Sequence, residues 1–350
     1  MTSESIQKIL IEFNLNGNSL KWSPLTSGLI NDTYLVTEDD GQQYILQKVN
    51  TLIFKNAEIL MDNISNTLPF LNADDYAKIT FLQTKNGEHS LKKNDGLWRM
   101  MTYIPNSTTY NTTTDNNIAF EAGRILGRFH SLLKDVDPSI VKETLPKFHN
   151  LNHRKREFNE ALANVDAQKK QIAEHAINKA HLFLTELEDL NISNLAVRIC
   201  HNDTKLNNIL FSETNNKALC LIDLDTIMKG YFFYDFGDAL RTVVNNAPED
   251  EQNHKLIIFD ESLFKAFVDG LAVNSSFLTT ADKDSLPLGA VFMPFIHGLR
   301  ALTDYLNKNK YYKVTYENQN LDRCLSLFNF AEKALNHKDF MATYIKSSLG

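Results

Sequence analysis

The segment 198–211, RICHNDTKLNNILF, gathers polar side chains between two apolar runs that are typical of strands. Lys205 follows Asp203 by two residues, and Asn208 follows it by five. Phosphoryl transfer needs a base for the acceptor hydroxyl, oxygen ligands for a divalent cation, and a positive charge near the moving phosphoryl group. The spacing therefore predicts Asp203 as the base, Lys205 at the γ-phosphate and Asn208 as a Mg²⁺ ligand. We expect His201 to support the backbone of this loop.

Two downstream aspartates could supply the second metal ligand. The letters Asp-Phe-Gly at 235–237 spell a protein-kinase metal motif, but Asp235 lies 27 residues after Asn208. Asp223, in LIDLD, lies 15 residues after Asn208, a distance that fits a strand, a turn and a returning strand. We predict Asp223 as the metal ligand and Asp235 as a structural acid near a helix start. Asp225 shares a strand face with Asp223 because side chains alternate with period two, so it could be a second metal ligand or a substrate ligand.

The elements around these residues change character along the chain. The first hundred residues predict mainly strands with one helix, and a turn signal at Asp40-Gly41 separates two of the strands. Later residues show apolar positions at helical spacing, interrupted by a short β pair around the polar loop. Strands are predicted at 23–28, 32–38, 44–49, 78–84, 97–104 and 217–225, and helices at 54–68, 117–133, 154–189 and from 236 to the end.

This order predicts two lobes with a cleft at residues 101–106. The N-terminal lobe, residues 1–103, would bind the nucleotide, and the C-terminal lobe, residues 104–350, would carry catalysis and the acceptor. With 350 residues the chain is long enough for both lobes to share a substantial core.

Composition limits the classes of function. The chain is 43% hydrophobic and 23% charged with a net charge of −7, which is typical of a soluble globular protein and argues against a general nucleic-acid or anionic-membrane binder. No apolar run is long enough to span a bilayer, and the N-terminus lacks the pattern of a signal peptide, so we expect a cytoplasmic protein. Cys200, Cys220 and Cys324 are too few and too scattered for a disulfide framework or a zinc site. The oligomeric state is left open, and a monomer is compatible with the sequence.

On these residues the chain resembles the aminoglycoside phosphotransferase and choline kinase superfamily, relatives of the protein kinases, and within it the N-acetylhexosamine 1-kinases. The resemblance covers nearly the whole chain, in segments 30–37, 44–54, 201–210, 222–228, 235–241 and 304–312. It implies an α+β, bilobal protein-kinase-like fold, with a small antiparallel sheet lobe and a larger, mainly helical lobe. It also implies ATP and Mg²⁺ as cofactors and the anomeric hydroxyl of N-acetylglucosamine or N-acetylgalactosamine as acceptor. By this match Asp203 is the base, while Asn208 and Asp223 hold the magnesium.

The nucleotide site departs from the protein-kinase pattern. One glycine, Gly28, stands in the loop that should cover the phosphates, and backbone amides near it and Asn31 could take that task. The third strand should supply a basic residue, but the matching position is Gln47, and Lys48 should face the other way unless the strand is bulged. Glu58 would pair with Lys48 only in that bulged case. Adenine is expected at the backbone of Met101 to Tyr103, between the apolar residues Ile30, Ile45, Leu210 and Ile222.

The acceptor site is predicted less directly. Arg300 and Asp304 lie four residues apart on one helix face, and the segment continues to Tyr311, Tyr312 and Tyr316. Basic residues mixed with tyrosines favour a neutral acceptor over a cationic one. Weaker candidates are Thr33, Asp32 and Arg241, and His149, His153 and Arg154 could line the cleft or support a loop.

Two other functions stay open. The acceptor could be an aminoglycoside, choline or another amino alcohol, or a different sugar. The chain could also be a kinase-fold binding module without turnover, a reading that only Gln47 supports.

Overall fold

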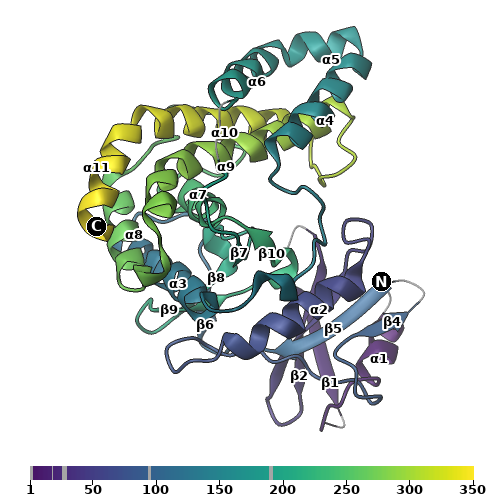
Figure 1. Ribbon diagram of the computed structural model, residues 1–350. Helices are drawn as coiled ribbons and strands as arrows, with labels where there is room; N and C mark the ends of the chain where they lie inside the picture. The colour runs from purple at the N-terminus through teal and green to yellow at the C-terminus, as the bar shows by residue number, and fades with distance from the viewer. Residues whose placement is uncertain (1–2, 18, 26–29, 94–95, 189–191) are drawn as a thin grey trace.

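An antiparallel sheet forms the N-terminal part of the chain, with its strands in the order β1-β2-β3-β5-β4 (Figure 1). The structure is a computed structural model that describes residues 3–17, 19–25, 30–93, 96–188 and 192–350. The elements of this part are α1 (Ser3–Leu10), β1 (Leu20–Leu25), β2 (Asp32–Glu38), β3 (Gln43–Val49), α2 (Ala57–Thr67), η1 (Leu68–Phe70), β4 (Leu91–Lys93) and β5 (Gly96–Thr102). The strands predicted at 32–38, 44–49 and 97–104 and the helix at 54–68 are confirmed, whereas α1 was not predicted.

The strand predicted at 78–84 is wrong. Its described backbone forms only isolated bridges, Phe81 to Met101 and Thr84 to Phe13. The edge of β5 that this segment would need is already shared, because β4 pairs with the first half of β5 at Gly96 to Trp98. Only the C-terminal end of β5 remains for residues 78–84, and they pair with it through the single bridge of Phe81 to Met101.

The two faces of β3 point to different surroundings. Tyr44 and Leu46 pack with Trp98 and Met100 in an apolar cluster that also contains residues of α1. Gln47 points from the opposite face, and in the register of β3 and β5 it lies beside Arg99. The pairing of these strands continues without a bulge from Tyr44–Thr102 to Val49–Leu97. The strand is therefore regular, and Lys48 faces away from Gln47, as the alternation of side chains predicted.

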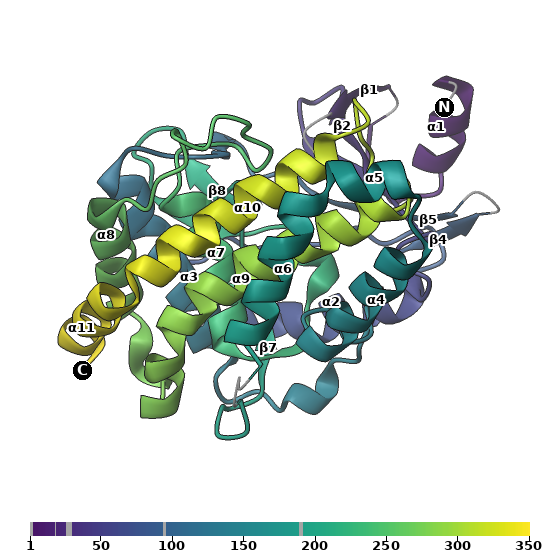
Figure 2. The same ribbon diagram turned by 90° about the horizontal axis from the view of Figure 1, so that it is seen from above.

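The rest of the chain is mainly helical (Figures 1 and 2). The single long helix expected over 154–189 is three helices, α4 to α6. The helices of this part are α3 (Asn116–Leu133), η2 (Pro138–Ile140), α4 (Leu151–Asn164), α5 (Ala167–Ile172), α6 (Glu174–Glu186), α7 (Phe232–Val243), α8 (Glu261–Ala272), η5 (Ser275–Phe277), α9 (Thr280–Leu306), α10 (Gln319–Asn336) and α11 (Lys338–Leu349).

Helix α9 runs through the middle of the helical part beside α10 (Figure 2). It is the one helix among the described residues that is long and apolar enough to cross a bilayer, and 78% of its apolar window is buried inside the protein. Burial by α7 and α10 accounts for its apolar composition as a core helix.

Short strands carry the polar loop. β7 (Arg198–Cys200) pairs with β10 (Met228–Gly230), and β8 (Ile209–Ser212) lies between β6 (Ser107–Thr108) and β9 (Ala218–Leu221). The turns η3 (Leu206–Asn208) and η4 (Leu224–Thr226) lie at the ends of these strands. The N–H of Ile222 donates to the carbonyl of Asn208 at 2.8 Å, so the two candidate metal segments run side by side.

The two parts of the chain are joined by α2. The main apolar core includes Val49 and Leu97 of the sheet together with residues of α2 and the helical part. Asn63 of α2 donates to the carbonyls of Lys142 and Ile227, at 2.7 and 3.0 Å. The helix therefore holds the sheet against the segment that follows Asp225, while the division at 103/104 stays a prediction.

Candidate active site

The loop that contains Asp203 is held by the carboxylate of Asp235. This residue is fully buried in the first turn of α7 and accepts hydrogen bonds from the backbone N–H groups of His201 and Asn202, at 2.8 and 2.7 Å. His130 contacts the same carboxylate at 2.9 Å. Asp235 thus makes structural contacts near the start of a helix, in the manner that the sequence predicted.

Side chains within the loop lock it to the segment 222–228. Asn202 has a left-handed backbone (φ 63°), and its side-chain amide donates to the carbonyls of Cys200 and Thr226 at 3.1 and 3.0 Å. His201 contacts the carbonyl of Ile222 at 2.9 Å, and the hydroxyl of Thr226 donates to the carbonyl of His201 at 2.7 Å. His201 therefore supports the loop and its side chain faces backbone.

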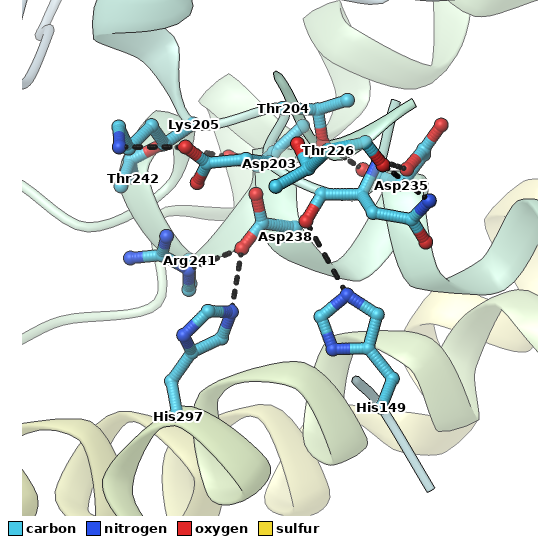
Figure 3. A network of polar contacts seen from close by, with 12 residues as sticks. His149, Asp203, Thr204, Lys205, Thr226, Asp235, Asp238, Arg241, Thr242 and His297 are labelled. Carbon is cyan, nitrogen blue, oxygen red and sulfur yellow. Dashed lines mark hydrogen bonds and ion pairs between the residues drawn. The ribbon is translucent and has the colours of Figure 1, made fainter. Parts of the chain in front are cut away.

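Lys205 and Asn208 converge on one carboxylate oxygen of Asp203, and Figure 3 shows the contact of Lys205. The ammonium of Lys205 lies 2.8 Å from Oδ2 of Asp203, and the side-chain amide of Asn208 donates to the same oxygen at 2.9 Å. Burial disfavours the charged lysine, but the carboxylates of Asp203 and Asp223 outweigh burial and raise the pKa of Lys205. Lys205 therefore stays cationic beside the carboxylate of Asp203.

The donor set fits a divalent cation. The NH₂ group of Asn208 is used on Asp203, at its backbone carbonyl (2.8 Å) and its carboxylate, so the amide oxygen is the end that could ligate a metal. Burial first, and then the charge of Asp225, raise the pKa of Asp223 to about 6. A half-buried carboxylate beside an amide oxygen is a ligand pair that Mg²⁺ prefers. Asp223 also has a left-handed backbone (φ 60°), which turns the chain from β9 into η4.

Asp225 is paired instead with the sheet. Its Oδ1 forms an ion pair with Arg99 at 2.5 Å, and its Oδ2 accepts from the amide of Asn31 at 2.7 Å. Arg99 also donates to the side-chain oxygen of Gln47, at 2.7 and 3.0 Å. Both carboxylate oxygens of Asp225 are thus in use, which disfavours its predicted place as an acceptor ligand.

Lys48 and Glu58 are not part of this arrangement. The ammonium of Lys48 lies 5.7 Å from the ring centre of Trp98, on the other face of the sheet. Glu58 forms an exposed ion pair with Lys92 at 2.6 Å. The lysine–glutamate pair of the bulged alternative is therefore not formed.

The predicted nucleotide residues lie along the junction of the two parts. Ile30, Met101, Leu210 and Ile222 are half-buried and pack against the main core from both sides of that junction, and Ile45 faces it from β3 opposite Met101. The N–H of Tyr103 donates to the carbonyl of Gln43 at 3.2 Å, so this donor is already used. Gly28 lies outside the described residues.

A second group of charged side chains faces Asp203 from the helical part (Figure 3). Arg241 pairs with Asp238 at 2.7 Å and with Glu249, and His297 lies 3.0 Å from Asp238. Burial opposes ionisation of Asp238, but Arg241 and His297 outweigh it and hold its pKa well below the usual range. Arg241 in turn has a raised pKa, because the charges of Asp238, Glu249 and Asp203 outweigh its burial.

The two histidines of this group, His149 and His297, both have lowered pKa values. Burial is the main cause of the lowered pKa of both His149 and His297, and nearby arginines add to it. His149 contacts the carbonyl of Asn202 at 3.3 Å, which makes its Nε2 the donor and its Nδ1 an acceptor. Among the described residues, neither this Nδ1 nor Oδ2 of Asp238 has a hydrogen-bond partner, although both are buried. Buried acceptors without donors are rare in proteins, and a donor on a bound ligand or a water molecule would satisfy them.

The candidates near the end of α9 have different surroundings. The guanidinium of Arg300 lies 4.5 Å from the ring centre of Phe148 and 5.8 Å from that of Tyr311. Burial opposes its charge, yet Tyr312, Tyr311 and Asp203 raise the pKa of Arg300. Arg300 therefore lies within the electrostatic range of the predicted base.

Asp304 and Tyr316 are engaged in local structure. Asp304 accepts from the backbone N–H groups of Tyr311 and Tyr312, at 2.8 and 3.0 Å, so it organises the turn after α9. Tyr316 is exposed and donates to Asp322 at 3.0 Å. The remaining candidates of the sequence are placed as follows: Thr33 accepts from Gln47 at 3.3 Å, Arg154 donates to the carbonyl of Phe148, and His153 lies 3.4 Å from Glu157.

Sequence reasoning missed Arg99, Asp238, Glu249 and His297. A signal existed for two of them, because Asp238 precedes Arg241 and His297 precedes Arg300 by three residues, a spacing that places side chains on one helix face. Arg99 and Glu249 carry no such local signal.

Comparisons with solved structures agree with this architecture. The microcompartment-associated aminopropanol kinase is 16% identical, with a TM-score of 0.65 over 97% of this chain and 99% of its own. A spectinomycin phosphotransferase solved with ADP and spectinomycin is 13% identical, with a TM-score of 0.63 over 96% and 98%. The choline kinase of Cryptosporidium parvum is 12% identical, with a TM-score of 0.60 over 99% of both chains. At these identities the similarity establishes a shared fold.

The α+β, kinase-like fold that the sequence predicted is therefore confirmed. The profile of the phosphotransferase enzyme family matches residues 21–265, a span that includes the sheet, the loop with Asp203 and helix α7. The chain belongs to this phosphotransferase enzyme family.

Proposed function

We propose that this protein is an ATP-dependent kinase that phosphorylates a hydroxyl group of a small molecule, and that the acceptor is the anomeric hydroxyl of an N-acetylhexosamine. The observation that carries the proposal is the convergence of Lys205 and Asn208 on one oxygen of Asp203, beside the metal-type carboxylate of Asp223. Base, cation and metal ligands are the parts that phosphoryl transfer requires.

The proposed reaction uses each of these groups at a stated atom. Oδ2 of Asp203 is held by Lys205 and Asn208, so we assign Oδ1 to receive the proton of the acceptor hydroxyl. Lys205 would then move its ammonium toward the transferred phosphoryl group and compensate its charge. Asn208 and Asp223 would hold Mg²⁺, which neutralises charge on the phosphate oxygens. ATP and Mg²⁺ are thus the proposed cofactors.

The charges around Asp203 favour an uncharged acceptor. A cationic acceptor such as choline needs a carboxylate or an aromatic cage that is free to receive it. Asp238 is paired with Arg241 and His297, and Arg241 also pairs with Glu249. Arg300 adds a further positive charge, and its cation already occupies the faces of Phe148 and Tyr311. The carboxylates on this side are therefore already matched with cations.

A sugar hydroxyl or an acetamido N–H would fit the unpaired acceptors. Oδ2 of Asp238 and Nδ1 of His149 are buried acceptors that a donor on the ligand could satisfy. An acetylated amino sugar supplies several hydroxyls and one amide N–H without a positive charge. This match supports an N-acetylhexosamine over an aminoglycoside or an amino alcohol.

The main alternative keeps the fold and changes the acceptor. The related structures are named as kinases of aminopropanol, spectinomycin and choline, so amino alcohols and antibiotics are the acceptors to compare. A binding module without turnover is the more distant alternative. A cytoplasmic location and small-molecule partners alone, with neither nucleic acid nor membrane, complete the proposal.

ADP release with a panel of acceptors tests this function. The purified chain is incubated with ATP and Mg²⁺ and with N-acetylglucosamine, N-acetylgalactosamine, choline, 1-amino-2-propanol or spectinomycin, and the reducing end of each sugar is assayed in the same tube. We expect ADP with the acetylated sugars only, together with loss of their reducing ends. ADP with another acceptor would replace the proposed substrate, and nucleotide binding without ADP from any acceptor would favour the binding module.

The base assignment is tested with Asp203→Asn. The variant keeps an isosteric side chain that can still contact Lys205, but it cannot accept the hydroxyl proton. We expect unchanged binding of MgATP and a loss of roughly 10²–10⁴-fold in turnover, as removal of a general base usually causes. Turnover near that of the unchanged enzyme would refute Asp203 as the base.

A further inference from the structure

A row of polar side chains crosses the inner face of the sheet and ends on the segment that carries the metal ligand. Thr33, Gln47 and Arg99 lie opposite one another on β2, β3 and β5. Gln47 donates to Thr33 at 3.3 Å and accepts two hydrogen bonds from Arg99. Arg99 then reaches across to Asp225 at 2.5 Å. The row therefore links the sheet to η4, two residues after Asp223.

The third strand carries no basic residue toward the cleft, and Arg99 supplies the missing charge from the neighbouring strand. Gln47 occupies the strand position that faces the junction, and Lys48 lies on the other face against Trp98. The guanidinium of Arg99 lies beside Gln47 on the junction side. Arg99 of β5 thus places a positive charge beside the amide side chain of Gln47 on β3.

The ion pair of Arg99 and Asp225 is almost completely buried, since the two side chains are 1% and 3% exposed. A buried ion pair seldom stabilises a fold more than apolar side chains of the same volume would, so stability alone does not account for it. What the pair adds is position, because it holds the segment after Asp223 at one place against β5. Asn31, on the loop before β2, donates to the other oxygen of Asp225 at 2.7 Å and so joins the same arrangement.

We propose that Arg99 is a positioning residue for nucleotide binding, which fixes Asp225, and with it the segment of Asp223, against the nucleotide-binding sheet. The proposal rests on the proposed kinase function. In it Asp225 is the counter-ion of Arg99 and contacts neither metal nor acceptor. Loss of the pair would let the sheet and the metal segment move apart, which would weaken binding of the metal-nucleotide complex and leave acceptor binding intact.

The test removes both charges together, because a single change would strand a buried charge and could unfold the chain. The variants are Arg99→Gln/Asp225→Asn, and Arg99→Gln and Arg99→Lys alone. Calorimetric titration with MgADP gives the dissociation constant without turnover, steady-state kinetics give separate KM values for MgATP and acceptor, and thermal unfolding gives Tm. The matched control is Glu121→Gln/Arg124→Gln, which removes a buried ion pair within α3, with side chains 12% and 9% exposed.

We expect the double variant of Arg99 and Asp225 to bind MgADP at least tenfold more weakly, with a similar rise in KM for MgATP and an acceptor KM changed by less than twofold. We expect Arg99→Lys to bind MgADP at least threefold more tightly than Arg99→Gln, because the lysine keeps the charge. The control should lower Tm without changing MgADP affinity.

Unchanged MgADP affinity in the folded double variant would overturn the proposal, and so would a lysine variant no better than the glutamine variant. An unchanged chain that binds no MgADP would instead overturn the kinase function itself. The two failures are therefore distinguishable.

Discussion

Replacement of Asp235 by asparagine separates the two candidate metal aspartates. In the structure this carboxylate lies inside the protein and receives the backbone N–H groups of His201 and Asn202 and the ring of His130. A protein-kinase reading of the letters Asp-Phe-Gly would instead make Asp235 the metal ligand. If Asp235 is structural, Asp235→Asn should lower the stability of the fold, and if it is a metal ligand, the same change should remove the Mg²⁺ dependence of nucleotide binding.

The magnitude follows from the number of donors that face the carboxylate. An asparagine oxygen can accept from one backbone N–H, but its NH₂ group would then face another donor that lies 2.7 or 2.8 Å from Asp235. Each hydrogen bond to a charged group contributes about 1.5–3 kcal/mol, and a buried donor left unpaired costs a further 1–3 kcal/mol. We therefore expect Asp235→Asn to lower the free energy of unfolding by roughly 3–5 kcal/mol.

Urea unfolding of the metal-free chain gives the free energy of unfolding. Repeating the unfolding with saturating MgADP shows whether the variant still binds the metal-nucleotide complex. The control is Asp115→Asn, since Asp115 caps α3 by accepting from one N–H at 2.8 Å and asparagine caps a helix about as well. We expect the control to change stability by less than about 0.5 kcal/mol. If Asp235→Asn were equally harmless to stability but removed the Mg²⁺ dependence of nucleotide binding, the assignment of the metal to Asp223 would be refuted.

Three further changes have defined outcomes. Asp223→Asn should abolish the Mg²⁺ dependence of ADP binding. Burial and the charge of Asp225 raise the pKa of Asp223 to about 6, so the metal-free chain without a substitution should gain stability as the pH falls from 7 through 6 toward 4. Urea unfolding of the Asp223→Asn variant should lack that gain in stability. Lys205→Met should lower kcat at least tenfold while the acceptor KM stays within twofold in steady-state kinetics, because the ammonium would act on the transferred group. Gly123→Ala should lower the free energy of unfolding in urea by about 1–3 kcal/mol, since its added carbon would lie 1.9 Å from the carbonyl oxygen of Phe267 in α8.

The parts of the site that the sequence predicted are those set by local spacing. Asp203, Lys205 and Asn208 lie within six residues, and the structure brings them onto one carboxylate oxygen. The distance from Asn208 to Asp223 matched a strand, a turn and a returning strand, and Ile222 does pair with Asn208. A short hairpin converts sequence distance into spatial distance with few alternatives, which is why this inference was possible.

Contacts between distant segments could not be predicted in this way. Arg99 lies 52 residues after Gln47 and 126 before Asp225, and nothing in its neighbours distinguishes it from a strand residue at the surface. Its position beside Gln47 depends on strand order, because β5 lies next to β3 in the sheet, and that order is not written in the local sequence.

Acceptor candidates chosen by helix periodicity had mixed outcomes. Arg300 faces the ring of Phe148 and lies within the electrostatic range of Asp203. Asp304, on the same predicted helix face, is used to hold the N–H groups of the following turn. Periodicity gives the face of a helix but not the path of the loop after it, and that loop decides which side chains remain available to a ligand.

The aspartates of the site differ in chemistry because they differ in partners. Both oxygens of Asp235 accept from backbone N–H groups, and Asp225 forms an ion pair with Arg99 through one oxygen and accepts from Asn31 through the other, so neither can turn toward a metal without breaking buried contacts. Asp238 is tied to Arg241 and His297 of the helical part and has one oxygen without a donor among the described residues. Asp203 contacts Lys205 through one oxygen, and a phosphate group could draw that lysine away. Asp223 has a pKa raised by burial and by a neighbouring carboxylate, and a divalent cation would offset the cost of holding its negative charge there. The residues free to do chemistry are therefore those whose contacts are incomplete until a ligand binds, and the Asp-Phe-Gly letters mark a carboxylate whose contacts are already complete.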